Sequence, residues 1–91
     1  MNQTIEVILK GRVQGVGMRF FINRQASRFG LNGYVRNQYN GTVQAVFQGD
    51  PNTISNLLQY IKKYSPGTID DLVITEIHDS KEYHKFTIKL F

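Results

Sequence analysis

Residues 4–30, TIEVILKGRVQGVGMRFFINRQASRFG, decide the fold. Within residues 4–12 apolar and polar side chains mostly alternate, and this period of two predicts a half-buried β-strand. Three glycines fall within residues 11–17, which predicts a loop. From residue 19 to residue 29 apolar positions recur at helical spacing, and Gly30 is the residue type that commonly ends a helix. The stretch therefore predicts a strand, a glycine-rich loop and an amphipathic helix in direct succession.

The next part of the chain predicts a β-hairpin. Residues 34–38 favour a strand, and residues 43–49 alternate apolar and polar side chains. Between them lies Asn40-Gly41, the strongest short hairpin signal, because a type I′ turn needs a positive φ at both central residues. We therefore expect two antiparallel strands joined by a type I′ turn.

The last part predicts a second helix followed by two strands. Asp50 is a favourable N-cap, and the proline after it suits the first helical position. A stripe at helical spacing supplies the buried face of this helix: Ile54, Leu57, Leu58 and Ile61. The sequence Ser-Pro-Gly at residues 65–67 ends it. Residues 69–77 and 84–91 are expected as strands, joined by a polar turn at residues 79–82.

The predicted order is strand, helix, strand, strand, helix, strand, with a short extra strand at the C-terminal end. Two helices on one face of an antiparallel sheet make an α+β two-layer sandwich, and this order is that of the ferredoxin-like fold. We expect residues 1–91 to form a single domain of this kind. The fold hosts enzymes, metabolite sensors, RNA binders and metal chaperones, so function has to be inferred from individual residues.

The composition narrows the classes of function. The 91 residues include no cysteine, which excludes a disulfide framework, a thiolate metal site and a cysteine nucleophile. No apolar run reaches the roughly 18 residues of a membrane span, and no secretory signal is recognisable, so we expect a cytoplasmic protein. A net charge of +4 favours anionic partners, although the basic residues are scattered along the chain.

The loop at residues 11–17 is the first candidate site. A junction from strand to helix leaves backbone amides unpaired at the positive end of the helix dipole, and glycines let the backbone curl around a ligand. Together they favour a nest for an anion of the size of phosphate. Arg19 is poorly placed for the dipole, but its planar guanidinium can hold two phosphate oxygens. Taken alone, the glycine spacing is more simply explained by a turn with a surface arginine, since no Walker or dinucleotide motif is present.

Asn37 is the second candidate. Asparagine is disfavoured inside strands, and Asn37 falls near the end of the strand predicted at residues 34–38. At that place its side-chain amide can present a donor and an acceptor to a bound water. By itself, Asn37 is more simply explained as a residue that caps the hairpin.

Three segments together resemble the acylphosphatase family: GRVQGVGMR at residues 11–19, GYVRN at 33–37 and NGTV at 40–43. The resemblance extends along the whole chain. It implies a hydrolase that splits the carboxyl–phosphate bond of acyl phosphates without a metal or another cofactor. The chain departs from the family at Met18, where phenylalanine is frequent, and at Gly17, where many members carry a larger residue. We expect both departures to change the packing of the loop rather than the chemistry.

The resemblance also assigns roles to residues. Arg19 is implied as the phosphate-binding arginine, and Asn37 as the residue that orients the attacking water for in-line displacement. The backbone amides of the phosphate cradle would be those of Gly15, Val16, Gly17 and Met18, running into Arg19. The implied partners are an acyl phosphate as substrate and inorganic phosphate as product and inhibitor, with no nucleic acid, no membrane and a monomeric chain.

Three alternatives remain open. An RNA-binding module of the same broad fold needs exposed aromatic residues on the central strands, in a run that residues 41–48 do not match. A non-catalytic phosphate or metabolite sensor would keep the loop without turnover, although the presence of both Arg19 and Asn37 favours an enzyme. The chain also fits a unit of a larger carbamoyl-transfer maturation factor, although Met1 and the terminal strand favour a free-standing protein.

The remaining polar candidates are not expected to form a site. His78 and His84 fall in or beside the last two strands, away from the loop, and are expected to face solvent. Asp70 and Asp71 are adjacent in a predicted strand, so they point to opposite faces and form no carboxylate pair.

Overall fold

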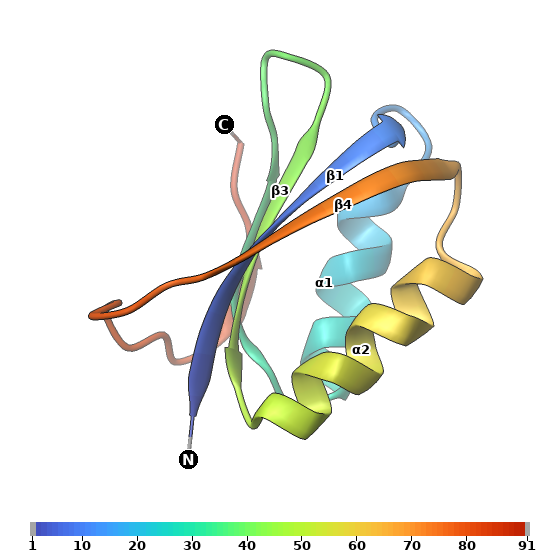
Figure 1. Ribbon diagram of the computed structural model, residues 1–91. Coiled ribbons are helices and arrows are strands. Elements are labelled where there is room, and N and C mark those ends of the chain that lie inside the picture. Colours follow the sequence, from blue (N-terminus) through green and yellow to red (C-terminus); the bar gives the residue numbers. More distant parts are fainter. Residues whose placement is uncertain (1, 91) are drawn as a thin grey trace.

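The computed structural model describes residues 2–90, which form two helices and five strands. Both helices pack on one face of the sheet, so the molecule has two layers (Figure 1). In chain order the elements are β1 (Gln3–Arg12), α1 (Met18–Arg28), β2 (Asn32–Asn37), β3 (Val43–Gly49), α2 (Pro51–Tyr64), β4 (Thr68–Glu76) and β5 (Phe86–Ile88). The predicted α+β, ferredoxin-like order of elements is confirmed.

The strand order across the sheet is β4-β1-β3-β2-β5, with β3 at the centre. The pairs β4–β1, β1–β3 and β3–β2 are antiparallel, whereas β5 runs parallel to β2. The predicted antiparallel sheet is thus found for β1 to β4, and the extra C-terminal strand β5 adds one parallel pair. The connection at residues 77–85 leaves β4 at one edge and passes along that end of the sheet to the other edge (Figure 1). The chain therefore returns antiparallel to β4, which makes β5 parallel to β2.

The predicted hairpin joins β2 and β3, but the predicted turn type is wrong. Gly41 has a φ of 89°, yet among the described residues only Asp79 combines a side chain with a positive φ, so Asn40 does not meet the requirement of a type I′ turn. The turn begins earlier, at Gln38, whose carbonyl accepts a hydrogen bond from the Gly41 amide at 3.1 Å. A longer loop with a glycine in the left-handed conformation is the common alternative to a two-residue turn.

The helices and the last strand differ slightly from the predicted bounds. Helix α1 starts and ends one residue earlier than predicted, and α2 begins with the predicted cap, Asp50. Neither helix is long and apolar enough to cross a membrane, which holds for residues 2–90. Strand β5 covers only part of the predicted range 84–91, of which Phe91 lies outside the described residues.

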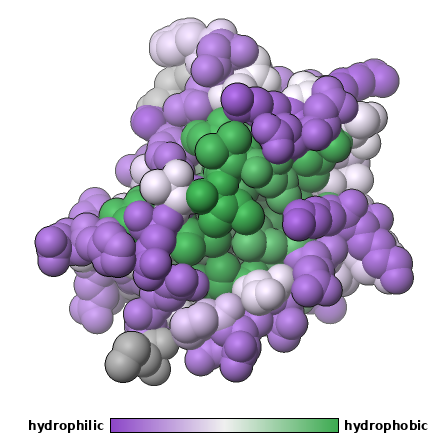
Figure 2. Space-filling model, viewed as in Figure 1, coloured by the Kyte–Doolittle hydropathy of each residue, from purple (hydrophilic) through white to green (hydrophobic). Residues whose placement is uncertain are grey.

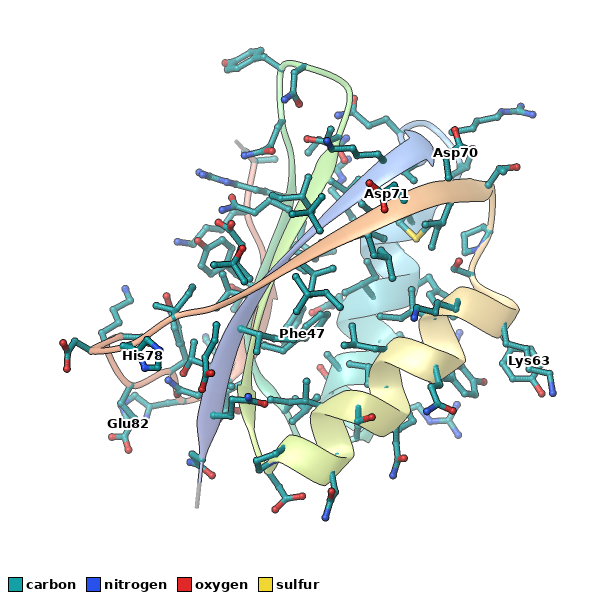
Figure 3. All side chains as sticks on the ribbon, in the orientation of Figure 1. Phe47, Lys63, Asp70, Asp71, His78 and Glu82 are labelled. Carbon is teal, nitrogen blue, oxygen red and sulfur yellow. The ribbon has the colours of Figure 1, made fainter. Side chains whose placement is uncertain are left out.

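The core lies between the sheet and the helices. Figure 3 shows Phe47 pointing from β3 into this space, where its ring stacks on that of Phe86 with centroids 5.6 Å apart. The buried faces of the two helices include Met18, Ile22 and Ala26 on α1, and Ile54, Leu57 and Ile61 on α2. The core is covered less completely between β4 and α2, where Figure 2 shows an apolar surface and Ile74 of β4 is exposed.

Candidate active site

The loop between β1 and α1 has the geometry of an anion nest. Gly15 and Gly17 have φ values of 71° and 86°, a conformation that glycine adopts without strain. Gly17 is the N-cap of α1, and no side chain caps this helix. Within residues 2–90, the backbone amides of residues 15–20 donate no hydrogen bond to another residue. Unpaired amides at the positive end of a helix dipole favour an anionic ligand.

The side chain of Gln14 joins this loop to the β2–β3 hairpin. Its amide nitrogen donates to the backbone carbonyls of Gln38 and Thr42, at 2.7 and 2.8 Å. The preceding residue, Val13, is buried in the core. The start of the loop is therefore fixed both to the core and to the strand pair that carries Asn37.

The segment after α2 supports the loop from another side. Gly67 lies so close to the loop that a Cβ at this position would meet the carbonyl of Arg12 and the side chain of Val16. Val16 in turn packs against the core. The side chain at residue 16 thus anchors the loop, while Gly15 and Gly17 on either side of it stay exposed.

Arg19 extends the positive potential of the loop. It lies half-buried in the first turn of α1, and this turn contains no acidic residue. Among residues 2–90 no carboxylate oxygen lies within 4.0 Å of its guanidinium. A cation at this end of a helix costs roughly 0.3–1 kcal/mol against the dipole. Since no carboxylate offsets its charge, Arg19 adds to the attraction that the amides exert on an anion.

Asn37 approaches the loop from the sheet. It ends β2 and lies on the same strand face as Val35, which is fully buried under the helices. The Oδ1 atom of Asn37 is buried and accepts no hydrogen bond within the described residues. Buried acceptors in proteins are nearly always paired, so an unpaired one indicates a place for a water or a ligand.

A single hollow of about 230 Å³ brings these groups together. It is lined by Val13, Gly15, Gly17, Met18, Arg19, Phe20 and Asn37. The loop and the tip of the hairpin lie at the same end of the molecule (Figure 1). Of the residues predicted for the site, only Val16 does not line the hollow, since its side chain packs against the Gly67 segment. The two sequence motifs thus meet at one place.

Contacts on the opposite face of the sheet hold the strand that carries Asn37. Arg36 donates from Nε to Oε1 of Gln44 at 2.5 Å, and Gln44 donates from Nε2 to Oε2 of Glu6 at 2.6 Å. These bonds link β2, β3 and β1.

Tyr34 also lies on β2. Burial raises the pKa of its phenol, which favours the neutral form.

Three residues at the site were given no role from the sequence: Gln14, which joins loop and hairpin, and Val13 and Phe20, which line the hollow. A signal for Phe20 exists, because residue 20 falls outside the apolar stripe of α1 and its side chain has no core to enter. Gln14 carries no such signal, because its acceptors are backbone carbonyls 24 and 28 residues further along the chain.

The other polar candidates take no part in the hollow. His78, His84, Asp70 and Asp71 are all exposed. Figure 3 shows His78 and Glu82 in the connection between β4 and β5, far from the tip of the hairpin. His84 lies 4.0 Å from Glu82. Across residues 2–90, no group of three or more histidine, aspartate or glutamate side chains could hold a metal ion.

The central strands lack the features of an RNA-binding sheet. Strand β1 contains no aromatic residue, and the one aromatic residue of β3 is Phe47, which is buried in the core. RNA-binding modules of this fold stack bases on exposed aromatic side chains of these strands. The structure therefore does not favour the RNA-binding alternative.

The match to a known family agrees with this geometry. The family model for acylphosphatase matches residues 5–88. The chain belongs to the acylphosphatase family. A curated acylphosphatase from Bacillus subtilis is 34% identical over 83 residues, which is 90% of this chain and 91% of that protein. The crystal structure of acylphosphatase from Bacillus subtilis matches with a TM-score of 0.90 at 32% identity and covers 98% of this chain and 99% of that one.

The acylphosphatase fold also occurs as part of a larger protein. The crystal structure of full-length HypF in the phosphate- and nucleotide-bound form matches with a TM-score of 0.88 at 28% identity. The match covers 98% of this chain but 12% of that one.

The family match confirms the prediction of an enzyme of the acylphosphatase class, at the level of the family.

Proposed function

We propose that this chain hydrolyses the carboxyl–phosphate bond of acyl phosphates, with residues 15–19 holding the phosphoryl group and Asn37 orienting the attacking water. One observation carries the proposal. A single hollow combines three kinds of group that have no partner within residues 2–90: loop amides without acceptors, an arginine without a carboxylate and a buried amide oxygen without a donor. Membership of the acylphosphatase family supports an acyl phosphate as the substrate class.

In this proposal the loop binds the phosphoryl group through charge. The amides of Gly15, Val16, Gly17, Met18 and Arg19 donate to the phosphoryl oxygens, and the Arg19 guanidinium binds two of them with its planar fork. As the bond between phosphorus and the acyl oxygen breaks, negative charge spreads over the phosphoryl oxygens. Donors that are already in position stabilise that charge without reorganisation, which is why they act on the transition state.

Asn37 acts on the water in the proposed reaction. Its side-chain oxygen accepts a hydrogen bond from a water that attacks phosphorus from the side opposite the acyl oxygen. A bond forms between the water oxygen and phosphorus, the bond between phosphorus and the acyl oxygen breaks, and the carboxylate leaves. A neutral amide is a poor base, so the proton of the water passes to a phosphate oxygen or to solvent. An acyl phosphate is already an activated anhydride, so positioning and charge stabilisation are sufficient.

We also propose a domain organisation, an oligomeric state and a cellular location for the protein. We expect residues 1–91 to act as one domain, as a monomer and in the cytoplasm. We also expect inorganic phosphate to inhibit the reaction, because the product would occupy the same loop as the phosphoryl group of the substrate.

Hydrolysis of benzoyl phosphate in ¹⁸O-labelled water tests the proposal. We expect the label in inorganic phosphate and not in benzoate, because water attacks phosphorus. Asn37→Ala should lower kcat and leave the inhibition constant of phosphate nearly unchanged. An equal loss of phosphate binding would instead make Asn37 a binding residue. If phosphate binds but neither benzoyl phosphate nor acetyl phosphate is hydrolysed, the chain is a non-catalytic phosphate sensor.

A further inference from the structure

Phe20 is an exposed aromatic residue at the edge of the hollow. Its side chain is 72% exposed, and it follows Arg19 directly in the first turn of α1. The next residue, Phe21, stacks on Tyr60, but within residues 2–90 the ring of Phe20 meets no other aromatic ring. Phe20 therefore contributes little to the core, and its ring is open to a ligand in the hollow.

The two parts of an acyl phosphate need different surroundings. The phosphoryl group is a tetrahedral anion and suits the amides and Arg19. The acyl group is joined to it through one oxygen and has to project away from the loop, towards the mouth of the hollow. Among the apolar side chains that line the hollow, Val13 and Met18 are each 1% exposed, so Phe20 is the one that a projecting group can reach.

We infer that Phe20 is a specificity-determining residue, which favours acyl phosphates with an aromatic or branched aliphatic substituent over acetyl phosphate. The inference rests on the proposed function, since it places the phosphoryl group in the loop. Contact between the substituent and the ring removes apolar surface of both from water, which favours the larger substituent. A methyl group is too small to cover the ring in this way.

A second hollow beside Asn37 offers the acyl group a different place. It is lined by residues 36–40, and its exposed aromatic residue is Tyr39. Both hollows share Asn37, but only the hollow with Phe20 also contains Arg19. A group attached to a phosphoryl held by Arg19 therefore meets Phe20 first. Tyr39 supplies a matched control, because it is also an exposed aromatic residue near the site.

The test is the ratio of kcat/KM for benzoyl phosphate to that for acetyl phosphate. We expect Phe20→Ala to lower this ratio about tenfold, which is the lower end of the effect of one apolar contact on specificity. Phe20→Leu should keep most of the ratio, and Tyr39→Ala should leave it unchanged. Comparing each variant with the unaltered chain cancels the different reactivities of the two substrates.

A binding measurement without turnover complements the kinetics. Titration calorimetry with phenylphosphonate and methylphosphonate should show a preference for the phenyl compound. Phe20→Ala should abolish this preference while the affinity for inorganic phosphate stays the same, because phosphate has no substituent to contact the ring.

The outcomes separate this inference from the proposed function. If the unaltered chain hydrolyses both substrates and Phe20→Ala leaves the ratio unchanged, the inference is wrong and the proposed function stands. A ratio that falls in Tyr39→Ala instead places the acyl group over the hairpin and also overturns the inference. If neither substrate is hydrolysed, the proposed function fails. The phosphonate titration then decides alone: a phenyl preference lost in Phe20→Ala supports the contact, and equal binding of the two compounds contradicts it.

Discussion

The two helices begin in opposite ways. At the start of α2 the Asp50 carboxylate accepts hydrogen bonds from the backbone amides of Asn52 and Thr53, at 3.0 and 3.2 Å. Pro51 occupies the first helical position, where it has no amide hydrogen to leave unpaired. At the start of α1 the cap is Gly17, which has no side chain to accept a bond, and the first turn has no acidic residue.

Under the proposed function, this difference separates a helix start that serves stability from one that serves binding. An N-cap side chain typically contributes roughly 0.5–2 kcal/mol to stability, which α1 lacks. In α1, Gly17 and Met18 donate no backbone hydrogen bond within residues 2–90, and both line a hollow with Arg19 and Asn37. In the proposed function, the backbone groups that Asp50 satisfies in α2 are matched in α1 by amides that bind a ligand with negative charge.

The largest expected effect comes from removing the cation beside the uncapped start. Arg19→Ala should lower kcat/KM for benzoyl phosphate by on the order of 10²–10³-fold, as the loss of a single electrophilic donor does in other enzymes. Arg19→Lys should recover only part of the activity, because an ammonium group lacks the planar fork. The measurement is steady-state kinetics on variants whose fold is checked by circular dichroism. Turnover close to normal in folded Arg19→Ala would rule out its proposed role.

Giving α1 the kind of cap that α2 has should weaken phosphate binding. Apart from its chain neighbours and the adjacent backbone of α1, a Cβ at Gly17 would meet no atom within 4 Å, so there is room for the side chains of Gly17→Asp and Gly17→Asn. Both pay the same backbone cost of about 1 kcal/mol for a positive φ, so the pair isolates the effect of charge. We expect Gly17→Asp to bind inorganic phosphate at least about tenfold more weakly than Gly17→Asn, because like charges meet at short range. Equal affinities in calorimetry would argue against binding at this loop.

Loosening the link between loop and hairpin should have a moderate effect. Gln14→Met keeps the length of the side chain but removes the two hydrogen bonds to the carbonyls of Gln38 and Thr42. We expect stability to fall by about 1–3 kcal/mol and kcat to fall more than the affinity for phosphate, because Asn37 shifts relative to the loop. Denaturant unfolding and inhibition by phosphate measure the two effects. A variant with lower stability and unchanged kcat would limit Gln14 to a structural role.

The smallest effect on activity is expected at the capped helix. Asp50→Ala should destabilise the protein by roughly 0.5–2 kcal/mol, since two amides lose their acceptor. For a domain of this size each kcal/mol corresponds to about 4–8 °C in Tm. The kcat/KM for benzoyl phosphate should stay the same at a temperature where the variant is folded. Lost activity without a change in Tm would contradict the division between the two helix starts.

Local signals explain why much of the fold could be predicted. The period of two in β1 and the cap at Asp50 depend on residues close together in sequence. The parallel direction of β5 could not be predicted, because it depends on the path that residues 77–85 take around the end of the sheet. The turn at Asn40 was predicted wrongly because the Gln38 backbone sets the loop length: its carbonyl accepts from the Gly41 amide, and its amide donates to the Thr42 carbonyl.

The site could be predicted only as far as its residues lie in recognisable segments. The loop and Arg19 stand in one contiguous motif, and Asn37 in a second. That the two segments line one hollow required the pairing of β2 with β3 and the position of α1 under them. The role of Gln14 could not be predicted, because nothing near it in sequence indicates which distant carbonyls its side chain binds.

The most direct test of the difference between the two helix starts is an NMR titration of the protein with inorganic phosphate, followed through the backbone amide resonances. We predict that the amides of residues 15–19 show the largest shifts and saturate together, while those of Asn52 and Thr53 at the capped start stay in place. Saturable binding of phosphate that leaves residues 15–19 unshifted would show that the uncapped start of α1 is not the anion site.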